Sequence, residues 1–222
     1  VLMISGLICK FFGALFRLPL TNILSLQGIG IFQMVMSLYS LSLSLVSGGV
    51  TSALSKLVSG ARAKGQEVKI GGYFRYGLLF SGCISLAIGA FFFIFSNFIA
   101  VVQGASQASA SYMLLALLLP LGAIIGVLRG IIQGYENMTP TAISQIIEQA
   151  FKFCFGLLFA YLFSQSTGGG VFGAFLGITI AEALALIYLT FVIKKSKIKA
   201  GRYNVRKEFY IKYLHHKTGE EH

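Results

Sequence analysis

The segment Lys10-Phe-Phe-Gly-Ala-Leu-Phe-Arg17-Leu-Pro19-Leu-Thr-Asn22 places two cations inside the first of a series of long apolar runs. Lys10 and Arg17 are close to two helical turns apart, so a continuous helix projects both from one face. A basic side chain at the middle of a bilayer costs about 2.5 to 3.5 kcal/mol, so this face needs a wet cavity, an anionic partner or side chains that snorkel to the interface. Pro19 is expected to kink the helix just beyond Arg17.

Composition predicts a polytopic membrane protein. The chain has 222 residues, 56% of them hydrophobic and 11% charged, and its mean hydropathy is +0.80. A spanning helix needs roughly 20 mainly apolar residues, and the chain offers about six such runs. These runs cover residues 1–24, 29–58, 73–102, 112–134, 140–163 and 171–193. We expect an all-α membrane protein in which residues 1–193 form one lobe of six transmembrane helices, followed at 194–222 by a basic cytoplasmic tail or inter-lobe linker.

Charge indicates orientation rather than a nucleic-acid partner. The formal net charge is +11, but the cations lie in breaks between apolar runs and in the tail, and no nucleic-acid-binding motif accompanies them. Charged breaks after the second, fourth and sixth runs alternate with uncharged breaks after the others. By the positive-inside rule, both termini are expected in the cytoplasm and the protein in the cell membrane. The chain is apolar from Val1 onward, so we also expect its N-terminus to be incomplete.

A polar stripe follows one face of the second run. Its members recur at three- and four-residue steps, as residues of one helix face do: Gln33, Ser37, Ser40, Ser44, Ser47, Thr51 and Ser55. Small hydroxylated residues favour close helix packing in membranes, and they equally suit a cavity wall that offers hydroxyl groups to a sugar or phosphate. Lys56 follows the stripe and is expected to add a third cation to the same side.

Three further charged residues lie inside the last two runs. Glu148 and Lys152 are spaced as a helical i,i+4 pair in the favourable order, so pairing along the helix is the simpler expectation and a proton relay the alternative. Glu182 stands alone among apolar neighbours. It is expected to be neutral or to pair with a cation such as Arg17.

Small residues mark two helix faces for close packing. The fourth run carries Gly122, Gly126, Gly130 and Gly134, and the sixth carries Gly169, Gly173, Gly177, Ala181 and Ala185.

Enzymatic chemistry finds no support in the sequence. It contains no catalytic triad, metal-ligand cluster or phosphate loop, so we expect a non-enzyme without cofactor or metal.

Four stretches in order resemble the stage V sporulation protein B group, which belongs to the polysaccharide transporters of the multidrug/oligosaccharidyl-lipid/polysaccharide exporter superfamily. The stretches are the opening segment, Gly28-Ile-Gly-Ile-Phe-Gln33, Ala53-Leu-Ser-Lys-Leu-Val58 and Gln133-Gly-Tyr-Glu-Asn-Met-Thr-Pro-Thr-Ala-Ile-Ser-Gln145. The resemblance covers most of the chain. It is fairly specific for the group and leaves the substrate open.

The resemblance implies a flippase that moves an undecaprenyl-linked oligosaccharide or peptidoglycan precursor across the membrane by alternating access. Such proteins have two six-helix lobes around a cationic cavity, so this chain is expected to be an N-terminal half that needs a second lobe or a second chain. By position, Lys10 and Arg17 would meet the diphosphate of a lipid-linked anionic glycan. Together with the polar stripe, the expected substrate-binding residues are Lys10, Arg17, Gln33, Ser37, Ser44 and Lys56.

Two other functions remain open. A cation-coupled multidrug exporter of the same superfamily needs buried carboxylates, yet the chain contains no Asp. A non-transporting membrane fragment or assembly partner would instead be recognised by what it binds. A role in sporulation rests on the resemblance alone.

Overall fold

Helices make up the regular structure of residues 2–165 and 169–195, which are the residues described by the computed structural model. In chain order they are α1 (Leu2–Ile23), α2 (Leu26–Leu43), η1 (Ser44–Gly48), α3 (Gly49–Ala63), η2 (Glu67–Lys69), α4 (Ile70–Ile94), α5 (Ser96–Val102), η3 (Ser106–Ala108), α6 (Ser109–Gly134), α7 (Thr139–Phe163) and α8 (Gly169–Lys195). Among the described residues, six helical stretches are long and apolar enough to cross a membrane. The prediction of an all-α, multi-pass membrane protein is confirmed. The predicted tail was residues 194–222: Lys194 and Lys195 are the last two residues of α8, and residues 196–222 lie outside the described residues.

The second span is longer than its apolar run predicts. It continues from Leu26 to Ala63, 38 residues, where the sequence placed its end near Val58. Its two α-helical parts, α2 and α3, are joined without a break by η1, a π-helical turn. Single π-helical turns within helices occur frequently at functional sites, so a functional site is expected next to η1.

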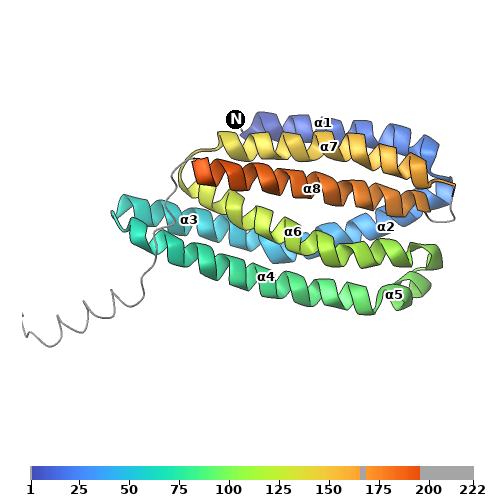
Figure 1. Ribbon diagram of the computed structural model, residues 1–222, viewed down its shortest axis with the longest axis horizontal. Coiled ribbons are helices and arrows are strands. Elements are labelled where there is room, and N and C mark those ends of the chain that lie inside the picture. Colours follow the sequence, from blue (N-terminus) through green and yellow to red (C-terminus); the bar gives the residue numbers. More distant parts are fainter. Residues whose placement is uncertain (1, 166–168, 196–222) are drawn as a thin grey trace, which may run out of the picture.

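The helices form two neighbouring groups along the long axis of the molecule. Helices α1, α7 and α8 lie side by side, and α3, α4 and α6 pack together beside them (Figure 1). Helix α2 begins at the end of the molecule where α1 ends, and it continues through η1 into α3 of the second group. Helix α6 also packs on α8 and so connects the groups. The beginning of α1 and the end of α8 lie at one end of the lobe, near the α3–α4 connection (Figure 1).

The predicted glycine face of α6 brings its backbone against η1 and α3. A Cβ atom added at Gly130 would lie 2.8 Å from the carbonyl oxygen of Thr51, and one added at Gly134 would lie 2.5 Å from Cβ of Val58. The glycines of α8 approach α7 just as closely: a Cβ at Gly177 would collide with the backbone of Gly156. Both predicted small-residue faces are therefore confirmed as close-packing surfaces.

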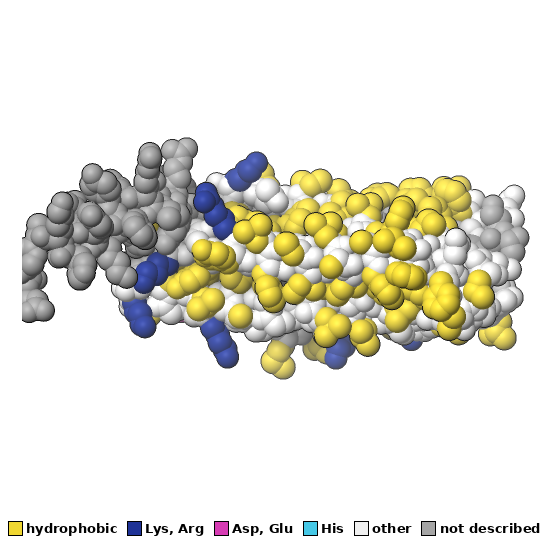
Figure 2. Space-filling view, turned by 90° about the horizontal axis from the view of Figure 1, so that it is seen from below, with side chains coloured by type: hydrophobic (Ala, Val, Ile, Leu, Met, Phe, Trp, Pro, Cys, Tyr) yellow, Lys and Arg dark blue, Asp and Glu magenta, His cyan; other side chains and the backbone are white. Residues whose placement is uncertain are grey.

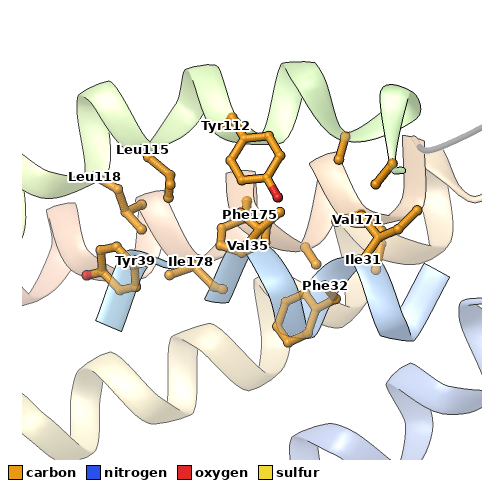
Figure 3. Packing of buried hydrophobic residues seen from close by; sticks show 14 of the residues in the cluster. Ile31, Phe32, Val35, Tyr39, Tyr112, Leu115, Leu118, Val171, Phe175 and Ile178 are labelled. Atoms are coloured by element: carbon orange, nitrogen blue, oxygen red, sulfur yellow. The ribbon is translucent and has the colours of Figure 1, made fainter. Parts of the chain in front are cut away.

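Large apolar side chains from α2, α6 and α8 fill the centre of the lobe (Figure 3). The labelled residues are Ile31, Phe32, Val35, Tyr39, Tyr112, Leu115, Leu118, Val171, Phe175 and Ile178. The Phe32 and Phe175 rings lie 5.3 Å apart between centroids. The outer surface is also widely apolar (Figure 2), as expected where the surrounding solvent is lipid.

Cations gather at one end of the lobe (Figure 2). This end includes the α3–α4 connection, where the guanidinium of Arg62 lies 5.0 Å from the centroid of the Tyr135 ring. Burial, with a smaller contribution from Glu67, raises the pKa of the Tyr135 hydroxyl above its ordinary value, so this contact holds a neutral phenol. The contact ties the α3–α4 connection to the α6–α7 connection on the basic end.

Candidate functional site: a polar cavity inside the lobe

A cavity of about 390 Å³ lies between the second span on one side and helices α7 and α8 on the other. It combines apolar, hydroxyl and charged side chains: Met36, Tyr39, Ser40, Leu43, Ser44, Ser47, Glu148, Gln149, Lys152, Ile178, Ala181 and Glu182. Because charged groups inside a membrane lobe are expensive unless they have a function or a partner, this cavity is the candidate site.

The π-helical turn and the end of α2 provide the hydroxyl wall of the cavity. Ser40 and Ser44 are exposed at its rim, and Ser47 lies partly buried behind them. The Ser47 hydroxyl donates to the carbonyl of Leu43, and that of Ser40 donates to the carbonyl of Ser37. Each hydroxyl oxygen keeps acceptor capacity, so this wall can receive hydrogen bonds from a polar ligand.

The polar stripe divides between its two expected roles. Ser40, Ser44 and Ser47 line the cavity, which fits the hydroxyl-wall interpretation. Thr51, one turn further, donates to the carbonyl of Gly126 on α6 at 2.9 Å, which is a packing contact between helices. Ser37 lies on the exposed side of α2 and donates to the carbonyl of Gln33 at 2.8 Å.

Glu148 does not form the ion pair that helical spacing predicts. Its Oε2 lies 2.8 Å from a terminal guanidinium nitrogen of Arg129 on α6, and Nε of Arg129 donates to the Ser144 hydroxyl at 3.1 Å. The expected Glu148–Lys152 pair is therefore corrected to a pair between helices. The physical reason is that Arg129 presents two donors in a rigid fork, so it binds α7 at Glu148 and Ser144 together.

Lys152 consequently faces the cavity without a close carboxylate. Among the described residues, no carboxylate oxygen lies within the 4.0 Å ion-pair distance of its Nζ. That Nζ lies 5.9 Å from the centroid of the Phe16 ring, and Arg17 is near enough to repel it electrostatically. Glu148 and Glu182 attract the Lys152 ammonium more strongly than Arg17 repels it, so Lys152 lies within electrostatic reach of charges on α1, α7 and α8.

Glu182 finds its partner on the second span rather than in Arg17. The Tyr39 hydroxyl donates to Oε1 of Glu182, while Oε2 is buried and has no hydrogen-bond partner among the described residues. The residue is only 4% exposed. The expectation of a pair with Arg17 is wrong, because Arg17 is exposed on α1 and instead donates to the side-chain oxygen of Gln33 at 3.4 Å.

The remaining predicted cations lie outside the cavity lining. Lys10 and Lys56 are exposed on α1 and α3, respectively. Arg17 and Gln33 are brought together by the packing of α1 against α2, a pairing that spacing along the chain does not predict. Pro19 lies within α1, which continues as a helix to Ile23. No group of three or more potential metal-ligating acids, cysteines or histidines occurs in the part of the chain that the structure describes.

Comparison with known proteins identifies the family of the chain. A family model described as "Polysaccharide biosynthesis protein" matches residues 1–216. The chain belongs to this family. Stage V sporulation protein B of Bacillus subtilis (strain 168) is 28% identical to it over 148 residues, which are 66% of this chain and 28% of that relative. The match therefore covers little more than a quarter of that relative's length. No solved structure matches the present chain.

Sequence reasoning missed two polar residues that organise the site of this family member. Tyr39 reads as one more aromatic residue in an apolar run, and its only signal is its place one residue before Ser40 of the polar stripe. Arg129 lies beside the glycine face of α6, and helical spacing within α6 does not indicate its partner on α7. An intramembrane arginine followed in the next run by an intramembrane glutamate is the signal that could have suggested the pair.

Proposed function

We propose that the chain forms one lobe of a membrane flippase that moves a lipid-linked anionic glycan, such as an undecaprenyl-linked oligosaccharide or peptidoglycan precursor, by alternating access. Membership in the polysaccharide biosynthesis family and a polar cavity inside a six-span lobe support this proposal. The observation that carries it is Lys152, a cation that lines the same cavity as Ser40, Ser44 and Ser47. Transport relocates the glycan and breaks none of its bonds.

The proposed ligand chemistry follows from these side chains. A lipid diphosphate carries several acceptor oxygens and negative charge, which ammonium and guanidinium groups bind through charge-assisted hydrogen bonds. Arg17 and Lys152 provide these donors, and the Gln33 side chain holds Arg17. Ser40, Ser44 and Ser47 add hydroxyl groups for the first sugar.

A second lobe or a second chain is proposed to complete the pathway. Lys10, Arg17, Ser37 and Lys56 are exposed on a lobe whose surface is otherwise rich in apolar side chains. The three cations among them would be costly if they faced lipid tails, whereas water or a polar protein surface stabilises them. In transporters built from repeats, the substrate site lies at the interface between the repeats.

We propose further that the basic end faces the cytoplasm of a cell, with the lobe in the cell membrane. The last turn of α3 carries Arg62, and the α3–α4 connection carries Lys64 and Lys69 against Glu67. The opposite end has uncharged side chains such as Gln103, Gln107 and Gln165. Positive loops favour the cytoplasmic side. Since α1 begins and α8 ends at the basic end (Figure 1), the first residue of α1 and the last residue of α8 would lie on the cytoplasmic side.

The test is flipping of a fluorescent undecaprenyl-diphosphate-linked sugar in proteoliposomes, for this chain alone and for the chain extended by a second six-helix lobe of the family. Arg17→Ala is expected to abolish flipping and Lys152→Met to slow it at least about tenfold, the worth of one charge-assisted hydrogen bond. Lys64→Ala, which removes a cation at the basic end, serves as the matched control and should leave the rate unchanged.

The outcomes separate the alternatives. Activity only in the extended form would make the chain half of a flippase, and activity of the chain alone would mean that copies of it assemble into a transporter. Normal flipping by both Arg17→Ala and Lys152→Met would refute the proposed cationic site. Efflux of a cationic drug that depends on Glu148 or Glu182 would instead support the multidrug exporter.

A further inference from the structure

Glu182 occupies the most enclosed position of any described charged side chain in the lobe. It lies mid-way along α8, between Ala181 and Ala185, which are both fully buried. Its Oε1 accepts a hydrogen bond from Tyr39, and its Oε2 is buried without a hydrogen-bond partner in the part of the chain that the structure describes. Glu182 is also one of the residues that line the cavity, together with Lys152.

An ionised carboxylate is poorly satisfied in this position. Two oxygens share the negative charge and accept several hydrogen bonds when ionised, but one donor is provided here. Leaving a charged oxygen buried and unpaired costs considerably more than leaving a neutral one. A proton on Oε2 would remove the charge and make that oxygen a hydrogen-bond donor, while Oε1 keeps its bond from Tyr39.

Each helix packed against α8 contributes a titratable or charged group near Glu182. Helix α2 contributes the neutral phenol of Tyr39, α6 contributes Arg129, and α7 contributes Glu148 and Lys152. Arg129 and Glu148 form an ion pair and cancel one another. Among the residues that line the cavity, the net charge is therefore set by Lys152 and Glu182: it is zero when Glu182 is ionised and positive when Glu182 is protonated, and Arg17 lies outside this lining.

We propose that Glu182 is a proton-binding site that controls the affinity of the cavity for an anionic ligand. With Glu182 protonated, Lys152 is the uncompensated charge of the cavity and binds the anion. When the proton leaves, the carboxylate competes for Lys152 electrostatically and the anion is released. The identity of that anion as a lipid diphosphate rests on the proposed function, whereas the proton site itself does not.

Reciprocity gives the proposal a second, independent consequence. If a proton on Glu182 strengthens anion binding, then an anion bound at Lys152 must strengthen proton binding by the same factor. Binding of an anion therefore takes up protons from solution. In a transporter, this linkage would let a proton gradient drive the loading and release of the anionic headgroup on opposite sides of the membrane.

The proton site is tested by infrared spectroscopy, which detects the carbonyl stretch of a protonated carboxylic acid, over the range from about pH 5 to about pH 9 in which buried glutamates titrate. The wild type is expected to show a titrating band that Glu182→Gln lacks. Glu136→Gln, which removes an exposed carboxylate between α6 and α7, is the matched control and should retain the band. Tyr39→Phe should move its midpoint. A wild-type titration that Glu182→Gln leaves intact would overturn the proposal.

Coupling is tested by binding of inorganic pyrophosphate to purified protein across the same pH range. Because pyrophosphate itself titrates, wild type and Glu182→Gln are compared at each pH. The two should bind alike at acidic pH, and the wild type should become weaker by about 5- to 150-fold at alkaline pH, the usual range of coupling between sites. Lys152→Met should bind weakly throughout.

An unchanging ratio between wild type and Glu182→Gln would overturn the coupling. If pyrophosphate binding follows the expected pattern but the lipid-linked sugar is not flipped, the proposed function fails and the proton-linked anion site stands. If flipping occurs without any contribution of Glu182 to the infrared titration, the proton site fails and the proposed function stands.

Discussion

Helices α6 and α7 follow one another in the chain and are both spans, yet they differ in what they bury. In the most apolar stretch of α6, 67% of residues are buried inside the lobe, against 11% for α7. Helix α6 turns a row of glycines toward η1 and α3, whereas α7 presents Phe151, Leu158 and Leu162 to the outside and carries Glu148 and Lys152. Helix α6 is enclosed by its neighbours, whereas α7 packs on α8 and α1 with one side and carries two of the charged residues that line the cavity.

The difference shows that hydrophobicity does not identify the core of a membrane protein. Lipid is as apolar as leucine, so large apolar residues gain little from facing inward. Small residues gain by allowing backbones to approach, and polar residues gain by finding partners. The glycine face of α6 and the charged positions of α7 are therefore the informative parts of two otherwise similar apolar runs.

The largest expected effect comes from breaking the packing role of α6. In Gly130→Leu the new side chain would collide with the backbone of Thr51 and with Leu54, and backbone atoms cannot move aside as a flexible side chain can. We expect a loss of stability of about 3 kcal/mol or more, measured as thermal unfolding in detergent and as loss of a monodisperse peak. Gly82→Leu on α4 is the control, since nothing lies within 4 Å of its added Cβ. Equal melting of the two variants would contradict the packing role of α6.

An intermediate effect is expected from removing the ion pair between α6 and α7. Arg129→Met leaves Glu148, whose side chain is 22% exposed, without its cation, and should lower stability by about 1 to 3 kcal/mol. The double variant Arg129→Met/Glu148→Gln should recover much of this loss, because no unpaired charge remains. A double-mutant cycle by thermal unfolding measures the coupling, with exposed Arg75→Met as the single-cation control. Additive effects would mean that the pair contributes nothing to joining α6 and α7.

The smallest effect concerns the polar stripe where it serves α6. Thr51→Val keeps the shape of the side chain but removes its hydrogen bond to the Gly126 carbonyl, and should cost about 0.6 kcal/mol, as such bonds between membrane helices do. Ser52→Ala removes a hydroxyl that bonds only within its own helix and should be neutral. Indistinguishable melting curves for the two would show that the stripe serves the cavity alone.

Much of the fold could be read from local pattern. Run length determined the six spans, because each must cross the same thickness of hydrocarbon. The spacing of Gly122, Gly126, Gly130 and Gly134 determined which face of α6 packs closely, since residues four apart share a helix face. The end of the second span was less predictable: the helix continues past Val58 through more polar residues to Ala63, where composition no longer reports on helicity.

The site depended on contacts between helices that spacing cannot specify. The sequence alone established that Arg17, Glu148, Lys152 and Glu182 are charged groups within membrane spans and therefore need partners. Only the tertiary structure decided that Arg129 takes Glu148, that Tyr39 takes Glu182 and that Lys152 is left facing the cavity. The physical reason is that periodicity fixes which residues share a face of one helix, whereas the rotation and depth at which helices pack decide which face meets which.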